Sequence, residues 1–393
     1  MNPDVFRWAR ETAGLSLEQA ASALAITHPK KLQAIEHGDE EVSRPLLLRM
    51  VKQYRRPLIT FYLQAPPPTG DRGEDFRTLP PDRVIADDAL LDALIRDVKA
   101  RQEVVRSLLE EDEEAEPLPF IGSMTMKDGT GAVMASIRDA LGLNLETYRR
   151  KRTAEDAFAY LRDKVEEAGI FVLLIGNLGS HHSAIKVQTF RGFAIADKLT
   201  PFIIINDQDA KTAWSFTLLH ELAHLWLGAT GVSGMNAEKA IERFCNEVAS
   251  LFLLPAGELD QLDVANSMAA EAAIEMISRF AGARHLSRKM VAYGLLRAGR
   301  ISQAFWAQLD QAIEDLWLRE RATHKEKAKE SEGGVSYYVV RRHRLGRALL
   351  NFVSRSMSDG SLTPVKAAKV LGVKPRSVYP LLAPTRAAAE GRE

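Results

Sequence analysis

The sequence has 393 residues, which is long for one domain and favours two to four structural units. Lysine and arginine together number 52 and so do aspartate and glutamate, which excludes an overall charge that would draw the protein to nucleic acid or membranes. The one cysteine excludes an internal disulfide, and the longest apolar stretch, 169–179, is too short to span a bilayer. We therefore expect a soluble, cytoplasmic protein with no membrane partner.

Residues 1–64 predict an all-α domain, because apolar residues recur at helical spacing in five short segments. Ser16 followed three residues later by Gln19 is the pattern of a capping box, which starts the second helix. Gly38 ends the third helix, as glycine often does just past the last helical residue. The segment is therefore expected to fold as a compact helical module.

The third of these helices, near 28–35, takes the place of the second helix in a helix-turn-helix, which such modules present to the major groove. Its candidate DNA-binding residues are Lys30, Lys31 and Gln33, whose side chains suit phosphates and base edges. The 64-residue region carries nine Lys or Arg against seven Asp or Glu, a weak basic footprint for an operator-binding module. DNA binding and docking of a like-folded protein are both hypotheses for it.

Proline and glycine crowd together after this module, and helical patterning then resumes and ends in an acidic run. We interpret residues 65–118 as a linker and helix. Residues 119–300 mix amphipathic helices with strand candidates at 169–176, 190–197 and 201–207, which are rich in branched and aromatic residues. This mixture predicts an α+β domain with a small sheet, followed by two long helices.

The first of those long helices, near 212–227, contains the sequence His-Glu-Leu-Ala-His at 220–224. Residues four apart lie on one face of a helix, so His220 and His224 can reach the same metal ion. Glu221 projects to the side, where it can accept a proton from a water molecule at the metal. Two imidazole ligands, a carboxylate base and an open coordination position are the arrangement of a zinc peptidase.

A third ligand is expected from the next helix, near 236–253, because catalytic zinc sites usually take three protein ligands. Glu242 lies at the edge of the apolar stripe of that helix and is the predicted ligand. Glu238, one turn earlier, lies at the same edge and stays an alternative, whereas Glu247 points nearly away from the stripe. Asn246, one turn after Glu242, is placed to orient that carboxylate without contacting the metal.

These ligands predict zinc as the cofactor, with manganese as the alternative, because two imidazoles and a carboxylate suit both ions. The metal would lower the pKa of its bound water and polarise a peptide carbonyl. Glu221 would take the water proton and pass it to the leaving amine. The predicted chemistry is therefore peptide hydrolysis.

The last part of the chain is charged and then basic. We interpret residues 301–332 as a charged helical linker and 333–393 as a basic helical region. The latter holds 11 Lys or Arg against 3 Asp or Glu, and predicts one long helix near 341–357 followed by a helix, a turn and a helix. It is either a nucleic-acid-binding surface or a solvated helical cap.

Two motifs and a strand pattern resemble the ImmA/IrrE family of metallopeptidases. That family pairs a His-Glu-x-x-His helix with a Glu-x-x-(Ala/Cys)-Asn helix that ends in a proline. Here the motifs are HELAH at 220–224 and ERFCN at 242–246, with Pro255 closing the second helix. The resemblance covers about residues 120–300, and it implies Glu242 as the third ligand beside the two histidines.

The N-terminal helices resemble the XRE-type helix-turn-helix that is often fused to this family, and DFRTLP at 75–80 resembles the segment that often follows it. The C-terminal region is similar to the tail of long family members. The family implies limited proteolysis of a regulatory protein, commonly an XRE-type repressor or an antitoxin. Such cleavage derepresses genes for stress, DNA damage or mobile elements.

We therefore predict an α+β, mostly helical protein. A helix-turn-helix domain precedes a zincin-like peptidase domain with a small sheet and two metal-bearing helices, and a helical C-terminal region follows. The predicted function is a metallo-endopeptidase that cleaves a helix-turn-helix repressor or antitoxin and thereby switches gene expression. The alternatives are a DNA-binding regulator or antitoxin whose peptidase-like domain is a scaffold, and a metal sensor without catalysis.

Overall fold

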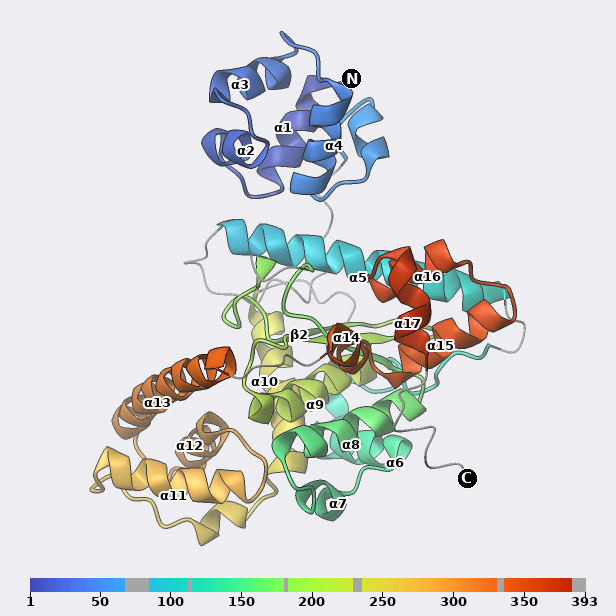
Figure 1. Cartoon of the computed structure of the whole chain (residues 1–393). Helices are drawn as coiled ribbons and strands as arrows, with labels where there is room; N and C mark the ends of the chain where they lie inside the picture. The colour runs from blue at the N-terminus through green and yellow to red at the C-terminus, as the bar shows by residue number, and fades with distance from the viewer. Residues whose placement is uncertain (68–84, 112–114, 180–182, 229–234, 331–335, 384–393) are drawn as a thin grey trace. The chain divides into compact units, whose positions relative to one another are not determined.

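In the computed structural model the chain is mostly helical with one three-stranded sheet, so the predicted α+β class is confirmed (Figure 1). The structure describes residues 1–67, 85–111, 115–179, 183–228, 235–330 and 336–383. The segment DFRTLP at 75–80 lies outside these residues. Within them, no helix combines the length and the apolar character needed to cross a membrane.

The chain divides into two compact units. One comprises residues 1–100 with 176–191, and the other comprises 101–175, 192–229 and 234–393. Each unit has a hydrophobic core of its own among the described residues.

The N-terminal helices enclose the smaller core. They are α1 (Pro3–Glu11), α2 (Leu17–Ala23), α3 (Pro29–His37), α4 (Arg44–Gln53) and the short 3-10 helix η1 (Leu58–Tyr62). The predicted capping box is present, because Ser16 and Gln19 exchange backbone-to-side-chain hydrogen bonds at the start of α2. A buried ion pair joins α1 to α3, with the Arg10 Nε atom 2.7 Å from the Glu36 Oε1 atom. Burial of apolar side chains and this ion pair together hold the module.

The sheet of the larger unit has the strand order β1-β3-β2. β3 (Phe202–Ile205) is central, parallel to β1 (Phe171–Leu174) and antiparallel to β2 (Gly192–Ile195). All residues of β1 and β3 are buried, which explains why their sequences are continuously apolar instead of alternating. The three strands lie within the three predicted segments.

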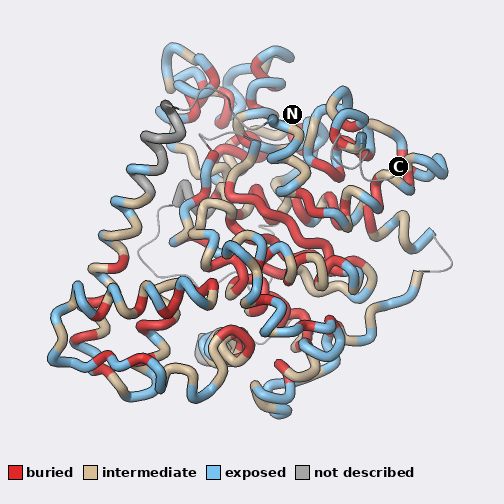
Figure 2. The backbone as a smooth tube through the Cα atoms, turned by 60° about the horizontal axis from the view of Figure 1, so that its bottom comes forward, coloured by how far each residue is buried: buried red, intermediate tan, exposed pale blue. Residues whose placement is uncertain are grey.

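Helices cover this sheet. α8 packs on β1, and α9 packs on β2 and β3. Figure 2 shows that the buried parts of the backbone concentrate at this centre, while the outer helices expose one side. The helices of the larger unit before the C-terminal region are α5 (Ile85–Glu111), which begins in the smaller unit, α6 (Thr130–Leu141), α7 (Leu145–Arg149), α8 (Ala154–Glu167), α9 (Lys211–Leu227), α10 (Met235–Leu253), α11 (Ala270–Gly282), α12 (Arg288–Arg297) and α13 (Gln303–Glu330), with 3-10 turns η3 (Met126–Asp128) and η5 (Glu258–Gln261).

The C-terminal region differs from the prediction in one respect. The single helix expected near 341–357 is two helices, α14 (Tyr337–Leu345) and α15 (Arg347–Ser358), with Gly346 between them. Gly346 has φ +77°, a conformation that glycine adopts at little cost and that breaks the helix. α16 (Pro364–Leu371), η6 (Pro375–Ser377) and α17 (Val378–Leu382) follow.

A buried ion pair fixes this break onto the sheet. The Arg162 Nε atom donates to the Glu166 Oε1 atom at 2.9 Å, and both side chains are almost fully buried. Arg162 also donates to the backbone carbonyls of His343 and Arg344, at the end of α14. The other carboxylate oxygen of Glu166 accepts the N–H groups at the start of α15. A Cβ atom at position 346 would lie 2.0 Å from that carboxylate, so glycine is required there.

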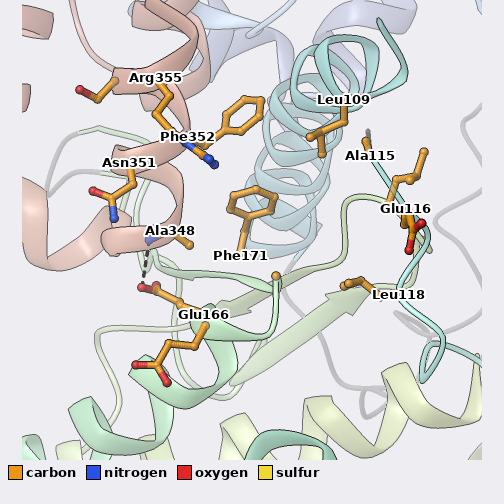
Figure 3. A pocket seen from close by; sticks show the side chains of 14 residues that line it. Leu109, Ala115, Glu116, Leu118, Glu166, Phe171, Ala348, Asn351, Phe352 and Arg355 are labelled. Carbon is orange, nitrogen blue, oxygen red and sulfur yellow. Dashed lines mark hydrogen bonds between the residues drawn. The ribbon is translucent and has the colours of Figure 1, made fainter. Parts of the chain in front are cut away.

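An open cavity of about 690 Å³ lies beside this junction. Phe171 at the start of β1 and Phe352 on α15 form its apolar walls (Figure 3). In Figure 3 the Glu166 carboxylate accepts a hydrogen bond from the backbone N–H of Ala348 at the edge of the cavity, with a distance of 3.1 Å. The C-terminal helices are therefore packed onto the sheet as part of the larger unit.

Candidate metal centre

The His-Glu-Leu-Ala-His motif lies in α9, a helix that is buried along most of its length. Apolar side chains surround its axis instead of following one stripe, which is the pattern of a helix packed on all sides. α6, α8, α10 and two strands contact it. The motif is therefore held in the interior of the larger unit.

The end of α9 is held by the segment that precedes α6. The backbone N–H groups of Gly122 and Met124 donate to the carbonyls of Leu225 and Trp226, at 2.9 and 3.1 Å. These bonds satisfy carbonyls that have no regular partner in the last turn of a helix. Gly228 ends the helix with φ +57°, and a Cβ atom there would lie 2.6 Å from the Gly122 Cα atom. The two backbones thus approach each other where no side chain fits.

α10 packs against α9 and carries the third predicted ligand. The Glu242 Oε2 atom lies 3.3 Å from the His220 Nε2 atom, and its Oε1 atom lies 3.2 Å from the His224 Nε2 atom. The two Nε2 atoms lie 3.1 Å apart. Among the described residues, these three form the one group of His, Cys, Asp and Glu side chains that could hold a metal ion together.

The donor set fits a divalent cation. Two ligand atoms about 2.1 Å from a tetrahedral ion lie about 3.4 Å apart, which is close to the three distances here. Two imidazole nitrogens and a carboxylate oxygen are ligands for zinc and also for manganese. The Nδ1 atoms of both rings are buried without a hydrogen-bond partner among the described residues, so packing and Glu242 orient the rings. The structure thus brings His220, His224 and Glu242 together, and the identity of the ion stays a prediction.

The electrostatics of the triad show how strongly its members interact. Burial alone would raise the pKa of Glu242, but hydrogen bonds from His220 and His224 and their charges hold that pKa well below its usual range. Burial alone would lower the pKa of His224, but contacts with Cys245 and Glu242 raise it well above its usual value. The lowered pKa keeps Glu242 ionised beside the two rings, and an ionised carboxylate is a suitable ligand for a cation.

Glu221 lies on the sheet side of α9 and is 5% exposed. A Cβ atom at Gly192, in β2, would lie 2.9 Å from the Glu221 Oε1 atom and 2.5 Å from the Thr217 Cγ2 atom. Gly192 therefore leaves the space in which the carboxylate sits. Sequence reasoning did not single out Gly192, although an isolated glycine in a strand pattern is a known sign of close approach.

Cys245 lies buried on the apolar stripe of its helix, as its spacing predicts, but the sequence did not indicate that it contacts a predicted ligand. It is fully buried on α10, and its thiol interacts with His224. Burial raises the pKa of the thiol, although His224 opposes this effect. The position of this cysteine beside a predicted ligand follows from how α9 and α10 pack.

The other predicted residues are less closely tied to the centre. Asn246 is exposed, and no hydrogen bond joins its side chain to Glu242 in the described structure, so its orienting role stays a prediction. Glu247, the unfavoured ligand, accepts a hydrogen bond from Thr130 at 3.1 Å. The side chain of Glu238 lies outside the described residues.

The predicted DNA-binding residues lie on α3 in the smaller unit. Lys30, Lys31 and Gln33 are all exposed. Lys31 forms an ion pair with Glu40, with 2.9 Å between its Nζ and the Oε1 atom. Their role in binding DNA stays a prediction.

Comparison with known families agrees with this centre. Residues 166–293 match the Peptidase M78 family, described as the IrrE N-terminal-like domain. The matched segment contains all three strands, the His-Glu-Leu-Ala-His helix and Glu242. It supports a peptidase-type domain here, and the triad supports a bound metal ion. No curated protein and no solved structure matches the chain significantly.

Proposed function

We propose that this protein is a metal-dependent endopeptidase that cleaves a regulatory protein. The proposal rests on the convergence of His220, His224 and Glu242, whose imidazole Nε2 and carboxylate oxygen atoms lie 3.1–3.3 Å apart. The buried Glu221 follows His220 directly in the sequence. Three protein ligands leave a fourth position open, which distinguishes catalytic from structural zinc sites. Zinc is the proposed ion and manganese the alternative.

Each residue has a defined part in peptide hydrolysis. The two histidines and Glu242 would hold the ion, which when bound polarises the scissile carbonyl and activates water. Glu221 accepts a proton as water adds to the carbonyl carbon, and it donates that proton to the amine as the C–N bond breaks. Burial of Glu221 against Gly192 fixes the carboxylate for this transfer.

The sheet supplies a site for the substrate backbone. β2 is the edge strand on the side where α9 packs, and it passes Glu221 at Gly192. We place an extended substrate segment alongside β2, since edge strands accept peptides by strand addition. A substrate held in this way lies with its backbone beside the proposed base.

The proposed substrate is a repressor or antitoxin of the helix-turn-helix type. The similarity of residues 166–293 to the IrrE N-terminal-like domain supports a peptidase, and the resemblance to the ImmA/IrrE family supports this class of substrate. The separately packed N-terminal helices supply a surface on which a like-folded protein can dock. Cleavage would then change transcription of the genes that the substrate controls.

The decisive experiment combines metal analysis with cleavage. The protein is incubated with a candidate helix-turn-helix repressor or antitoxin, with zinc, with manganese or with a chelator, and the products are identified by mass spectrometry. Glu221→Gln is expected to retain the metal and lose about 10²–10⁴-fold in cleavage rate. Glu242→Gln is expected to lose both, whereas Glu247→Gln on the same helix is the matched control and keeps both.

Two results would favour the other hypotheses. A wild-type protein that binds no stoichiometric metal, while its regulatory output survives loss of both histidines, indicates a scaffold. Retention of metal and of full regulatory output in Glu221→Gln indicates a metal sensor without catalysis.

A further inference from the structure

The last helices of the larger unit carry a group of unpaired basic side chains. Residues 360–383 contain four Lys or Arg and no Asp or Glu. Lys366 and Lys369 lie on α16, and Lys374 and Arg376 lie in the turn and in η6 before α17; all four are exposed. Among the described residues, none of the four forms an ion pair, so their charges face solvent.

Four other arginines of this region, Arg341, Arg342, Arg344 and Arg347, are occupied. Arg344 forms an ion pair with Asp207 at 2.5 Å, and Arg347 forms one with Asp163 at 2.8 Å. Arg341 and Arg342, on α14, donate instead to backbone carbonyls at the ends of α16 and α17. In the sequence these residues form one basic region. In the structure the four arginines bind other groups of the protein, whereas Lys366, Lys369, Lys374 and Arg376 form a free basic face.

Arg341 and Arg342 fix the two helices that carry this face. Arg341 donates to the carbonyls of Leu371 and Gly372 at 2.9 and 2.8 Å, at the end of α16. Arg342 donates to carbonyls at the end of α17, those of Pro380, Leu381 and Ala383, at 2.6–2.8 Å. Carbonyls at helix ends lack internal partners and carry partial negative charge, so arginine suits them.

The two helices have the layout of a helix-turn-helix. α16 is capped by Thr363, ends at Gly372 with φ +60°, and is followed after a short turn by η6 and α17. Together with α15 they enclose a small core of Ala367, Leu371, Val378 and Leu381, all buried. After the turn, Arg376 in η6 and Tyr379 in α17 are both exposed, Tyr379 by 64%. In a helix-turn-helix the second helix is the one that enters the major groove.

No acidic side chain of the described residues is seen to neutralise this face. Glu116 is the last acid of the acidic run at 110–116, and it lines the cavity beside α15 together with Asn351 and Arg355 (Figure 3). None of the four free basic residues lines that cavity. Asp359, at the end of α15, is bonded to Ser361.

From these contacts we infer that the α16–α17 pair binds double-stranded DNA. Lys366 and Lys369 contact phosphates as α16 crosses the backbone, and Lys374 and Arg376 contact phosphates at the edges of the groove that the second helix enters. Tyr379 packs against sugar or base edges there. This inference is independent of the metal centre. It assigns DNA binding to the C-terminal pair, whereas in the N-terminal module Lys31 is already paired with Glu40.

The test is fluorescence anisotropy of full-length protein with a labelled duplex of about 30 base pairs, over about 50–200 mM salt. Four phosphate contacts predict a slope of about −3.6 in log affinity against log salt, or about a 100-fold loss across this range. The variant Lys366→Gln/Lys369→Gln/Lys374→Gln/Arg376→Gln is expected to lose nearly all of this salt-dependent binding. Single changes at Lys369 and Arg376 are each expected to reduce the slope by about one.

The matched control removes the same charge from exposed basic residues on other elements of the larger unit, as Lys127→Gln/Arg152→Gln/Arg297→Gln/Arg319→Gln. It is expected to bind as the wild type does. An unchanged circular dichroism spectrum and an unchanged thermal unfolding midpoint show that the C-terminal variant is folded. The inference is overturned if the wild type shows no salt-dependent binding, if the control loses binding and the C-terminal variant does not, or if single-stranded RNA of equal length competes as well as the duplex.

Discussion

Two clusters of buried polar side chains in the larger unit differ in how their polar atoms find partners. Arg162 and Glu166 carry opposite charges, and their remaining hydrogen-bonding atoms meet backbone groups at the junction of α14 and α15. His220, His224 and Glu242 also lie close together, but both Nδ1 atoms are unpartnered in the described structure and the Nε2 atoms face each other. The first cluster is complete from its own residues, whereas the second gathers donor atoms around one point.

This difference separates a structural cluster from a functional one. Buried charges are tolerated when every polar atom is satisfied, and such a network fixes the arrangement of the elements it joins. Two imidazole nitrogens and a carboxylate that converge on one point form a donor set that suits a cation. The comparison therefore predicts that substitutions in the Arg162–Glu166 cluster lower stability without changing metal binding. Substitutions in the His220–His224–Glu242 cluster are expected to weaken metal binding and thereby to lower stability.

The largest expected effect is the loss of zinc from a ligand variant. Three ligands that share about 13 kcal/mol of zinc binding contribute about 4 kcal/mol each, so His224→Ala is expected to weaken zinc more than about 1,000-fold. Zinc at about 1,000 times the wild-type dissociation constant raises wild-type stability by about 4 kcal/mol, and this gain disappears in the variant. Calorimetric titration and thermal unfolding measure the two quantities. His37→Ala, an exposed histidine on α3, is the control, and an equal loss there would contradict the assignment.

The next effect is on stability alone. Glu166→Ala leaves Arg162 buried without its partner and leaves the N–H groups of Arg347 and Ala348 without their acceptor, so a loss of about 3–5 kcal/mol is expected. Denaturant unfolding measures this loss, and the zinc content is expected to stay at the wild-type level. Glu167→Ala removes the neighbouring exposed carboxylate, which pairs with Lys164, and is expected to stay within about 0.5 kcal/mol of wild type. Equal costs for the two variants would show that the buried pair does not hold the junction.

A smaller effect is expected where the sheet meets the base. Gly192→Ala places a methyl group against Thr217 and Glu221, and overpacking of this kind costs about 1–3 kcal/mol. The displaced carboxylate is expected to lower the cleavage rate at unchanged zinc content. Gly131→Ala on α6 is the control, because a Cβ atom there meets nothing within 4 Å and the helix gains about 0.5–1 kcal/mol. Unchanged cleavage in Gly192→Ala would show that Glu221 does not depend on this contact.

Much of the metal centre could be predicted because its signals are local. Helical spacing places His220 and His224 on one face, and the phase of the next helix favours Glu242 over Glu247. The three strands are recognisable because a small buried sheet consists of continuous apolar runs. Each of these inferences uses only residues within one element.

Features that depend on distant parts of the chain were not predictable. The break at Gly346 lies in a segment with good helical spacing, and the ion pair that fills the space beside this glycine is on α8, far away in the sequence. The space that Gly192 leaves for Glu221 and the contact of Cys245 with His224 likewise depend on packing between elements. Charge counting also failed to separate Arg341 and Arg342, which bind carbonyls, from the free lysines of α16.

The smallest expected effect is the pH dependence of the triad, measured with a chelator present. The pKa of Glu242 is lowered, so its contribution to stability is present above its usual value of 4.5 and is lost as the pH falls through the lowered pKa. The pKa of His224 is raised above 6.5, so its contribution is full below 6.5 and is lost as the pH rises through the raised pKa. Between 4.5 and 6.5 both contributions are present, and above 6.5 the chelated protein is expected to lose thermal stability.

Zinc affinity is expected to change with pH in the opposite direction to the stability of the chelated protein. This difference distinguishes the metal centre from the Arg162–Glu166 cluster. A metal ligand must be a neutral imidazole, so release of the His224 proton favours the ion, and zinc affinity is expected to rise as the pH increases above 6.5. The rise in melting temperature on adding zinc should therefore grow over the pH range in which the chelated protein weakens. His224→Gln removes the titrating group, and both trends are expected to flatten in it. If the opposite trends persist in this variant, the titrating group lies elsewhere. The Arg162–Glu166 cluster has no unpartnered buried side-chain atom in the described structure through which zinc could act.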